Sequence, residues 1–224
     1  MLVAWFPAGA LGTNCWVLAP AAGERCLVID PGQGAAPGVA ELVAEHRLRP
    51  AGVLITHGHL DHTWDAEQVC AAYGVPVYVG ASDRPWLADP AGGLSADFAS
   101  FIAGVAFREP ADVRELKGGE ELDELAGVGL LVEHTPGHTA GSICFSVRSD
   151  GETPSLLVTG DTLFEGAIGR TDLPTGSYPT IMRSLASLLQ AHDDETAVLP
   201  GHGGLTTIGR EREQNPYLAD IAVR

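Results

Sequence analysis

The chain has 224 residues, of which 45% are hydrophobic and 19% charged, and its formal net charge at pH 7 is -16. This length suits one well-filled domain, and the apolar content excludes an intrinsically disordered chain. Surfaces that hold nucleic acid are basic, so the acidic balance argues against a nucleic-acid partner. We therefore expect a single domain over residues 1–224 that acts on a small molecule.

The amino-terminal segment and the cysteines predict where the protein works. The apolar run after Met1 lacks a basic region and is interrupted by Pro7, which is typical of a first strand and not of a signal peptide. No apolar stretch has the length needed to span a bilayer, so no membrane partner is expected. The four cysteines lack regular spacing and are expected to be buried and reduced, as in a cytoplasmic protein (Cys15, Cys26, Cys70 and Cys144).

Short apolar runs alternate with turns rich in glycine and proline, a pattern that indicates a mixed α/β protein. In the first half we predict strands over residues 2–6, 14–18, 25–29, 52–56 and 75–79, and helices over 39–47 and 63–73. Residues 80–110 are weakly patterned and are predicted to form a loop with short helices that covers a site. In the second half we predict strands over residues 112–115, 129–133, 142–147, 156–159 and 197–199.

The clearest helix is predicted over residues 179–190, and a short one around 211–221. Ser177 is a suitable N-cap for the former, and Pro179 fits its first turn. A stripe of apolar residues at helical spacing is expected to pack in the core (Ile181, Leu185, Leu188 and Leu189).

The strongest chemical signal is the segment Thr56-His-Gly-His-Leu-Asp-His62. His57 and His59 are two positions apart, so they point the same way from an extended segment. Asp61 and His62 follow at a helix start and can face a second point nearby. Imidazole together with carboxylate suits zinc, iron or manganese. The segment therefore predicts half of the ligands for two adjacent metal ions.

A repeated sequence pattern completes the ligand set. After each of three predicted strands, a glycine is followed directly by a residue that can bind metal. The three stretches are Pro136-Gly-His138, Thr159-Gly-Asp161 and Pro200-Gly-His202. Glycine permits the backbone angles that bring a strand end close to a metal.

These residues divide between two sites. We expect His138 to join His57 and His59, and His202 to join Asp61 and His62. Asp161 is expected to bridge the two ions, because a carboxylate has two oxygens. We predict two divalent metal ions per chain, with zinc favoured and iron or manganese as alternatives.

This ligand order resembles the metallo-β-lactamase fold superfamily, whose HxHxDH motif, later His, later Asp and final His are all present. Within it the chain is similar to the small glyoxalase II-like hydrolases. The matching stretches are Thr135-Pro-Gly-His-Thr139, Gly160-Asp-Thr-Leu-Phe164, Gly169-Arg-Thr-Asp172, Pro200-Gly-His-Gly203 and Thr206-Thr-Ile-Gly209. The resemblance covers almost the whole chain and implies a four-layer αββα sandwich of two mixed β-sheets flanked by helices.

The resemblance also implies thioester hydrolysis of the S-lactoylglutathione type. Two metals bridged by Asp161 lower the pKa of a shared water, which gives a bridging hydroxide as the nucleophile. Asp61 and Asp161 are therefore the expected catalytic carboxylates. A thiolate leaves without a strong general acid, since thiols ionise at moderate pKa. The expected partner is a small-molecule thioester.

Several alternatives are open or ranked lower. Lactonases of the same fold share the ligand set. Persulfide dioxygenases also carry a Gly-Arg-Thr-Asp stretch, but they use one iron at the positions of His57, His138 and Asp161. A β-lactamase is disfavoured because no signal peptide is recognised, and a non-catalytic module because all seven ligands are present.

Two departures from glyoxalase II leave the acyl group and the thiol carrier open. Glyoxalase II has an acidic residue and Tyr after its final ligand His, where Gly203 and Gly204 stand here. It also has a helical carboxy-terminal domain with basic residues that hold glutathione, whereas residues 203–224 form one short helix at most.

Other polar residues are given structural roles. Asp30, before Pro31 and Gly32, is interpreted as a turn residue in preference to a residue that supports the site. Arg170 and Asp172 are interpreted as an ion pair that holds a loop. The remaining histidines are interpreted as surface or packing residues (His46, His134 and His192).

Overall fold

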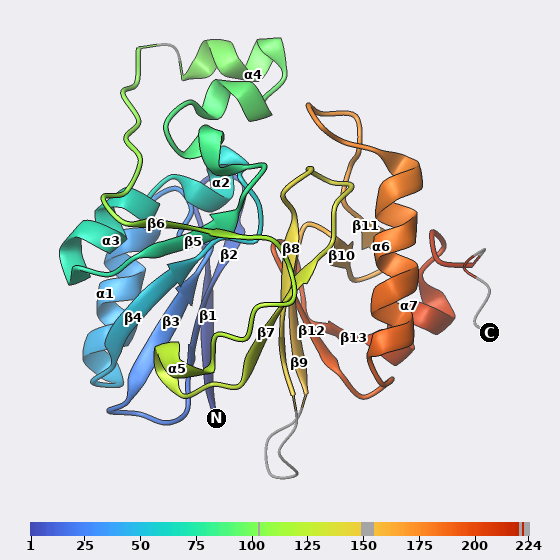
Figure 1. The fold of residues 1–224 in the computed structure, drawn as a ribbon, viewed down its shortest axis with the longest axis horizontal. Helices are drawn as coiled ribbons and strands as arrows, with labels where there is room; N and C mark the ends of the chain where they lie inside the picture. The colour runs from blue at the N-terminus through green and yellow to red at the C-terminus, as the bar shows by residue number, and fades with distance from the viewer. Residues whose placement is uncertain (103, 149–154, 220, 222–224) are drawn as a thin grey trace.

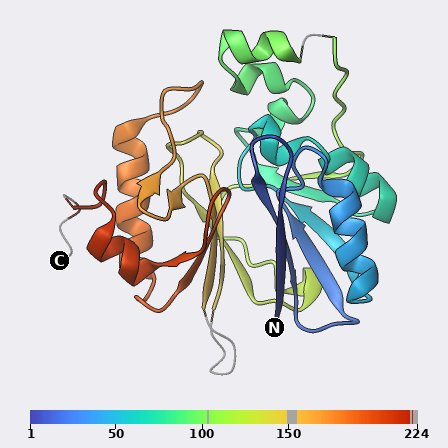
Figure 2. The ribbon, with the colours of Figure 1, turned by 180° about the vertical axis from the view of Figure 1, so that it is seen from behind.

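The computed structural model describes residues 1–102, 104–148, 155–219 and 221. Two mixed β-sheets pack face to face, and helices cover their outer faces (Figures 1 and 2). The first sheet has the order β1 (Leu2–Ala8), β2 (Thr13–Ala19), β3 (Arg25–Ile29), β4 (Arg49–Leu54), β5 (Val77–Gly80) and β6 (Val113–Leu116). Strands β1 to β3 pair antiparallel, and β3 to β6 pair parallel.

The second sheet runs from β13 (Thr206–Thr207) through β12 (Ala197–Pro200), β9 (Leu156–Gly160) and β8 (Ile143–Val147) to β7 (Leu130–His134). Only the β12–β9 pair is parallel in this sheet. A short antiparallel ribbon of β10 (Leu163–Phe164) and β11 (Ala167–Ile168) follows β9.

The helices complete the outer layers. Helices α1 (Ala35–Glu45) and α3 (Ala66–Tyr73) cover the first sheet, and α6 (Tyr178–Ala191) and α7 (Ile208–Gln214) cover the second (Figure 1). The short helices α2 (Leu60–Thr63), η1 (Arg84–Leu87), η2 (Pro90–Gly93) and α4 (Ala96–Phe101) lie together at one end, and α5 (Asp123–Ala126) lies at the other. This is the expected four-layer sandwich.

Strand β2 illustrates how the sequence produces these layers. Trp16 and Leu18 point into the core between the two sheets, whereas Cys15 and Val17 point into the core under α1 and α3. Both faces of the strand are therefore buried, as expected for a strand covered on both sides. A third core lies under α6, and it contains the whole predicted stripe of that helix, including Ile181 and Leu185.

Every predicted strand is present, with ends that differ by a few residues. The helix predicted over residues 39–47 begins earlier, at Ala35, because Pro37 is tolerated in a first turn. The one predicted over 63–73 corresponds to α3, which begins three residues later, and the separate short helix α2 precedes it. Ser177 is the N-cap of α6, but its hydroxyl contacts Thr180 Oγ1 at 2.8 Å and makes no capping bond to the backbone. The helix predicted around 211–221 spans only α7.

The cysteines are free and buried, as predicted. Among the residues that the structure describes, no helix has both the length and the apolar character required to cross a membrane.

Candidate metal centre

The seven side chains predicted to bind metal converge at the end of the sandwich where α2 lies. His57 and His59 follow strand β4, Asp61 and His62 lie in α2, and the other three follow β7, β9 and β12 (His138, Asp161 and His202). The carboxyl ends of these strands meet at the same edge of the sandwich, and the loops that leave them carry the polar side chains.

One group consists of three buried histidines, His57, His59 and His138, which we name the first ligand group. His138 Nε2 lies 3.2 Å from His57 Nε2 and 2.9 Å from His59 Nδ1. His57 Nε2 lies 3.1 Å from His59 Nδ1. Three ring nitrogens so close together surround a point that one metal ion can occupy.

Asp61, His62 and His202 form the second ligand group. His202 Nε2 lies 3.3 Å from His62 Nε2 and 3.2 Å from Asp61 Oδ2. Asp61 and His62 both lie in α2, whereas His202 follows β12, far along the sequence.

Asp161 lies between the two groups. Its Oδ1 is 3.3 Å from His62 Nε2, and its Oδ2 is 3.6 Å from His138 Nε2 and 3.7 Å from His202 Nε2. The carboxylate thus reaches members of both ligand groups, which is the position that a bridging ligand requires.

Hydrogen bonds at the outer nitrogens turn the inner nitrogens toward the centre. His138 Nδ1 donates to the carbonyl oxygen of Arg170 at 2.7 Å, and His202 Nδ1 donates to that of Leu11 at 3.2 Å. His62 Nδ1 donates to Asp30 Oδ2 at 2.9 Å. An imidazole whose Nδ1 carries the proton presents a lone pair at Nε2, as metal-binding histidines do.

His57 and His59 are oriented in other ways. Thr56 Oγ1 donates to Asp30 Oδ2 at 2.7 Å and can therefore accept from His57 Nδ1, 3.2 Å away. His59 faces the centre with Nδ1. The Trp86 ring stacks on the His59 ring, with 5.8 Å between the ring centroids.

Two buried atoms in the cluster have no hydrogen-bond partner among the described residues, His59 Nε2 and Asp161 Oδ1. A buried carboxylate oxygen without a donor is costly unless a cation satisfies it. The donor set of imidazole nitrogens and carboxylate oxygens, with its lone pairs directed inward, therefore fits divalent metal ions such as zinc or iron.

The two groups differ in their electrostatics. Burial, with the neighbouring histidines adding to it, lowers the pKa of His59 to about 3, and it lowers the pKa of His57 as well. Burial also acts against a charged His62, but the carboxylates of Asp61 and Asp161 outweigh it and raise its pKa. His57 and His59 of the first ligand group are therefore held neutral, whereas His62 of the second group lies beside the negative carboxylates of Asp61 and Asp161.

Glycine is required at two of the strand ends that carry ligands. A Cβ at Gly201 would lie 2.4 Å from Asp161 Oδ1 and 2.6 Å from His62 Cε1. Gly160 has a φ of +48°, and a Cβ there would lie 2.3 Å from Thr56 Oγ1. At both positions a side chain would occupy space that the cluster needs.

Asp30 is a correction to the sequence interpretation. It is fully buried and accepts hydrogen bonds from Thr56 N, Thr56 Oγ1 and His62 Nδ1, so it supports the cluster and is more than a turn residue. The sequence position of Asp30 could have indicated this role. Asp30 follows β3, which is parallel to β4, so it lies at the same edge of the sheet as the histidines that follow β4.

Thr13 and Asp83 were also missed. Thr13 Oγ1 donates to Asp61 Oδ2 at 3.0 Å. Asp83 accepts from the backbone N–H groups of Gly58 and Gly141 and from Thr139 Oγ1, and so it joins the loop of His57 and His59 to the loop of His138. Both come from segments distant in sequence.

The predicted ion pair of Arg170 and Asp172 is confirmed, with two contacts of 2.8 Å. It lies on the surface, where such pairs contribute little stability.

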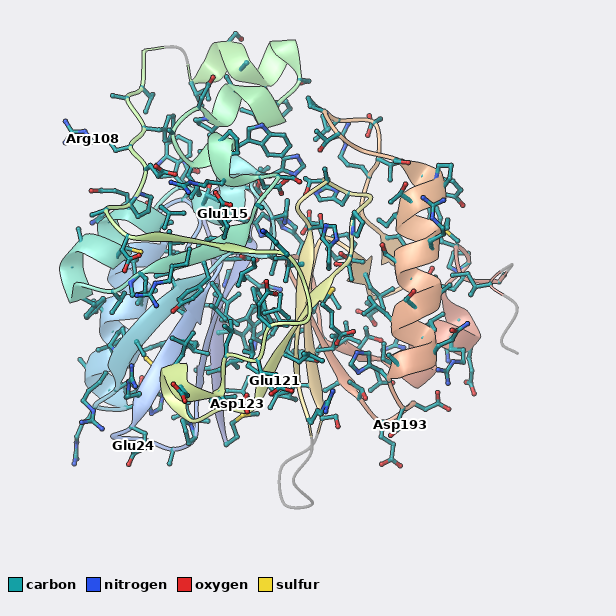
Figure 3. The ribbon with its side chains drawn as sticks, in the orientation of Figure 1. Glu24, Arg108, Glu115, Glu121, Asp123 and Asp193 are labelled. Atoms are coloured by element: carbon teal, nitrogen blue, oxygen red, sulfur yellow. The ribbon has the colours of Figure 1, made fainter. Side chains whose placement is uncertain are left out.

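Four of the acidic side chains that Figure 3 labels lie at the end of the molecule away from α2 (Glu24, Glu121, Asp123 and Asp193). Part of the negative charge is therefore remote from the metal centre.

Sequence comparisons identify relatives of the whole chain. The family described as the Metallo-beta-lactamase superfamily matches residues 8–202. An uncharacterized protein of Mycobacterium tuberculosis is 47% identical over 224 residues, which are 99% of this chain and 100% of the relative. Hydroxyacylglutathione hydrolase GloC of Haemophilus influenzae is 32% identical over 193 residues, which are 83% of this chain and 84% of that protein.

Solved structures agree with the sequence comparisons. The BLEG-1 B3 metallo-beta-lactamase is 29% identical with a TM-score of 0.82, covering 97% of this chain and 100% of that chain. TTHA1623, solved in a di-iron-bound form, is 33% identical with a TM-score of 0.78 and the same coverage of 97% and 100%. With its cluster of His and Asp side chains, the chain belongs to the metallo-beta-lactamase superfamily of metal-dependent hydrolases.

Proposed function

We propose that the protein is a dinuclear metal-dependent hydrolase that cleaves thioesters of the S-lactoylglutathione type. The observation that carries this proposal is the position of Asp161, whose two oxygens reach members of both ligand groups. When bound, a pair of divalent ions supplies Lewis acidity and a water that ionises near neutral pH. In the overall reaction the C–S bond breaks, and water yields a carboxylic acid and a thiol.

The chain's own residues would bind the ions and orient the carboxylates. The two ligand groups would each hold one ion, with Asp161 shared and with Asp61 and Asp161 as the catalytic carboxylates. Thr13 donates to Asp61 Oδ2 and thereby fixes the orientation of that carboxylate. The leaving thiol needs no strong proton donor, because thiols ionise at moderate pKa.

Zinc is the proposed metal, because imidazole and carboxylate donors suit it. Iron is the alternative to test first, since the similar protein TTHA1623 was solved in a di-iron-bound form. We also propose that the protein acts in the cytoplasm, where four free cysteines stay reduced.

The thiol carrier is proposed to be weakly recognised. Glutathione carries two carboxylates, and cations would be needed to hold them. Arg170 is paired with Asp172, Arg210 with Glu165, and Arg212 with Asp194. None of these three guanidinium groups is available without breaking an ion pair, so we expect several thiol carriers to be accepted.

The test combines metal analysis with a hydrolysis assay. Protein purified without added metal should contain two divalent ions per chain and should hydrolyse S-lactoylglutathione. His202→Ala should lose activity, whereas the control variant His46→Ala, outside the cluster, should not. One iron per chain with oxygen consumption on glutathione persulfide would identify a dioxygenase instead. Cleavage of lactones or β-lactams without cleavage of thioesters would also reject the proposal.

A further inference from the structure

An apolar cavity of about 500 Å³ lies beside the second ligand group. Its walls come from four parts of the chain, namely the tip of the β1–β2 hairpin, Gln33 before α1, α2 with the residue after it, and the segment around α4. The apolar side chains that define it are Leu11, Leu60, Trp64, Leu94, Phe98 and Ile102. Its size lies in the range of small-molecule sites.

Three contacts connect this cavity to the metal centre. Asp61 of the second ligand group lines it directly. Thr13 also lines it and donates to Asp61 Oδ2 at 3.0 Å. Leu11 lines it with its side chain, and its carbonyl oxygen accepts from His202 Nδ1 at 3.2 Å. A molecule held in the cavity therefore lies directly beside the reacting centre.

The lining selects for an uncharged, apolar group. Among the described residues that line the cavity, Asp61 is the one charged residue, and none of them is a cation. A ligand carboxylate placed there would be desolvated without a positive partner. Phe98 and Leu11 are 54% and 60% exposed, so a ligand that covered them would remove apolar surface from water.

We propose that the natural substrate carries an uncharged alkyl or aryl group next to its scissile carbonyl, and that this group binds in the cavity. The inference rests on the proposed hydrolase function and deepens it by naming a substrate class. Such a group can belong to the acyl part or to the leaving thiol. The cavity is thus a specificity site that a glutathione carrier, with its two carboxylates, does not fill.

Binding of hydroxamates tests the cavity without relying on turnover. Hydroxamates chelate metal ions, so a series from acetohydroxamate through butyro- and hexano- to octanohydroxamate extends an alkyl chain from the centre. Calorimetry on the metal-loaded protein should give a Kd that falls roughly three- to fourfold per added methylene until the cavity is filled.

Variants in two different segments that line the cavity make the test specific. Phe98→Asp and Leu11→Asp should each flatten the dependence on chain length. Val105→Asp is the matched control, because Val105 is 48% exposed on the same connecting segment but lines a different cavity. It should leave the series unchanged. A flat series in the unaltered protein would overturn the inference, as would a rise that persists in both folded wall variants.

Two series of substrates then show whether the apolar group belongs to the acyl part or to the leaving thiol. One varies the acyl chain on a constant small thiol, and the other varies an alkyl thiol on a constant lactoyl group. The series in which kcat/KM rises identifies the part that occupies the cavity. A rising hydroxamate series without any thioester cleavage would reject the proposed function alone. Cleavage with flat binding and flat kcat/KM would reject the apolar substrate class alone.

Discussion

The carboxylate of Asp30 accepts a hydrogen bond from His62 Nδ1 at 2.9 Å, and both side chains are buried. The same carboxylate accepts from the hydroxyl of Thr56, which lies 3.2 Å from His57 Nδ1. One residue outside the centre therefore orients a histidine in each ligand group. Partners of this kind are as important to a metal site as the ligands themselves.

Asp30→Asn should lower the affinity for metal roughly tenfold to a hundredfold, because the amide replaces an acceptor oxygen with a donor. The second ligand group should be affected more, since its His62 bonds to Asp30 directly. Asp65→Asn is the control, because Asp65 is also buried but accepts from Ala36 N. Equal metal loss in the two variants, measured by competition with a chelator, would contradict this role.

Asp161→Ala should abolish hydrolysis and weaken both metals, because its two oxygens reach both ligand groups. Asp61→Ala or His62→Ala should empty the second group first and leave the first occupied. Metal content per chain and kcat are the measurements. Full activity with one metal bound in the last two variants would contradict the dinuclear mechanism.

Gly201→Ala should impair the centre although it changes no ligand. The new Cβ would lie 2.4 Å from Asp161 Oδ1, so the strand end or the carboxylate must move. We expect a fall in kcat of roughly tenfold or more, since small displacements of catalytic groups are costly. Gly129→Ala, where a Cβ meets nothing within 4 Å, is the control and should keep its activity.

Stability should depend on pH through Glu133. Burial acts against its charge, but the bond to His192 at 2.8 Å and other contacts outweigh burial and lower its pKa. A lowered folded-state pKa means that the stabilisation is present above the unfolded-state pKa and is lost as pH falls through the folded-state pKa. Glu133→Gln should therefore lower Tm at neutral pH, with a difference that closes in acid.

The control for this measurement is Glu41→Gln at an exposed helix position. It should shift Tm little at any pH. A difference between Glu133→Gln and the unaltered protein that stays constant down to acid pH would contradict the linkage to this carboxylate.

The thiol carriers of lactoyl thioesters should be poorly distinguished, because the candidate arginines are engaged in ion pairs. We expect kcat/KM values within about tenfold for glutathione, coenzyme A and simpler thiols of similar polarity. A strong preference for the glutathione ester would reveal cationic contacts elsewhere on the chain and would weaken the case for an apolar substrate group.

The sequence patterns predicted a mixed α/β protein and the seven candidate ligands, and the resemblance to the superfamily implied the four-layer sandwich. The ligands could be predicted because the spacing of His57 and His59, and a glycine before each of His138, Asp161 and His202, are local properties. The apolar run over residues 14–18 is equally local, and it predicted the strand that the structure shows as β2. Helix ends were less accurate, and α1 begins at Ala35 because Pro37 is tolerated in its first turn.

Only the tertiary structure decided which atoms support those ligands. Asp30 is 32 residues from His62, and Leu11 is 191 residues from His202, so no local pattern joins either pair. The apolar cavity likewise needs the β1–β2 hairpin tip and the segment around α4 to meet beside Asp61. Spacing along the chain determines which side chains can act as metal ligands. Sheet order and packing determine which side chains come within hydrogen-bond distance of those ligands.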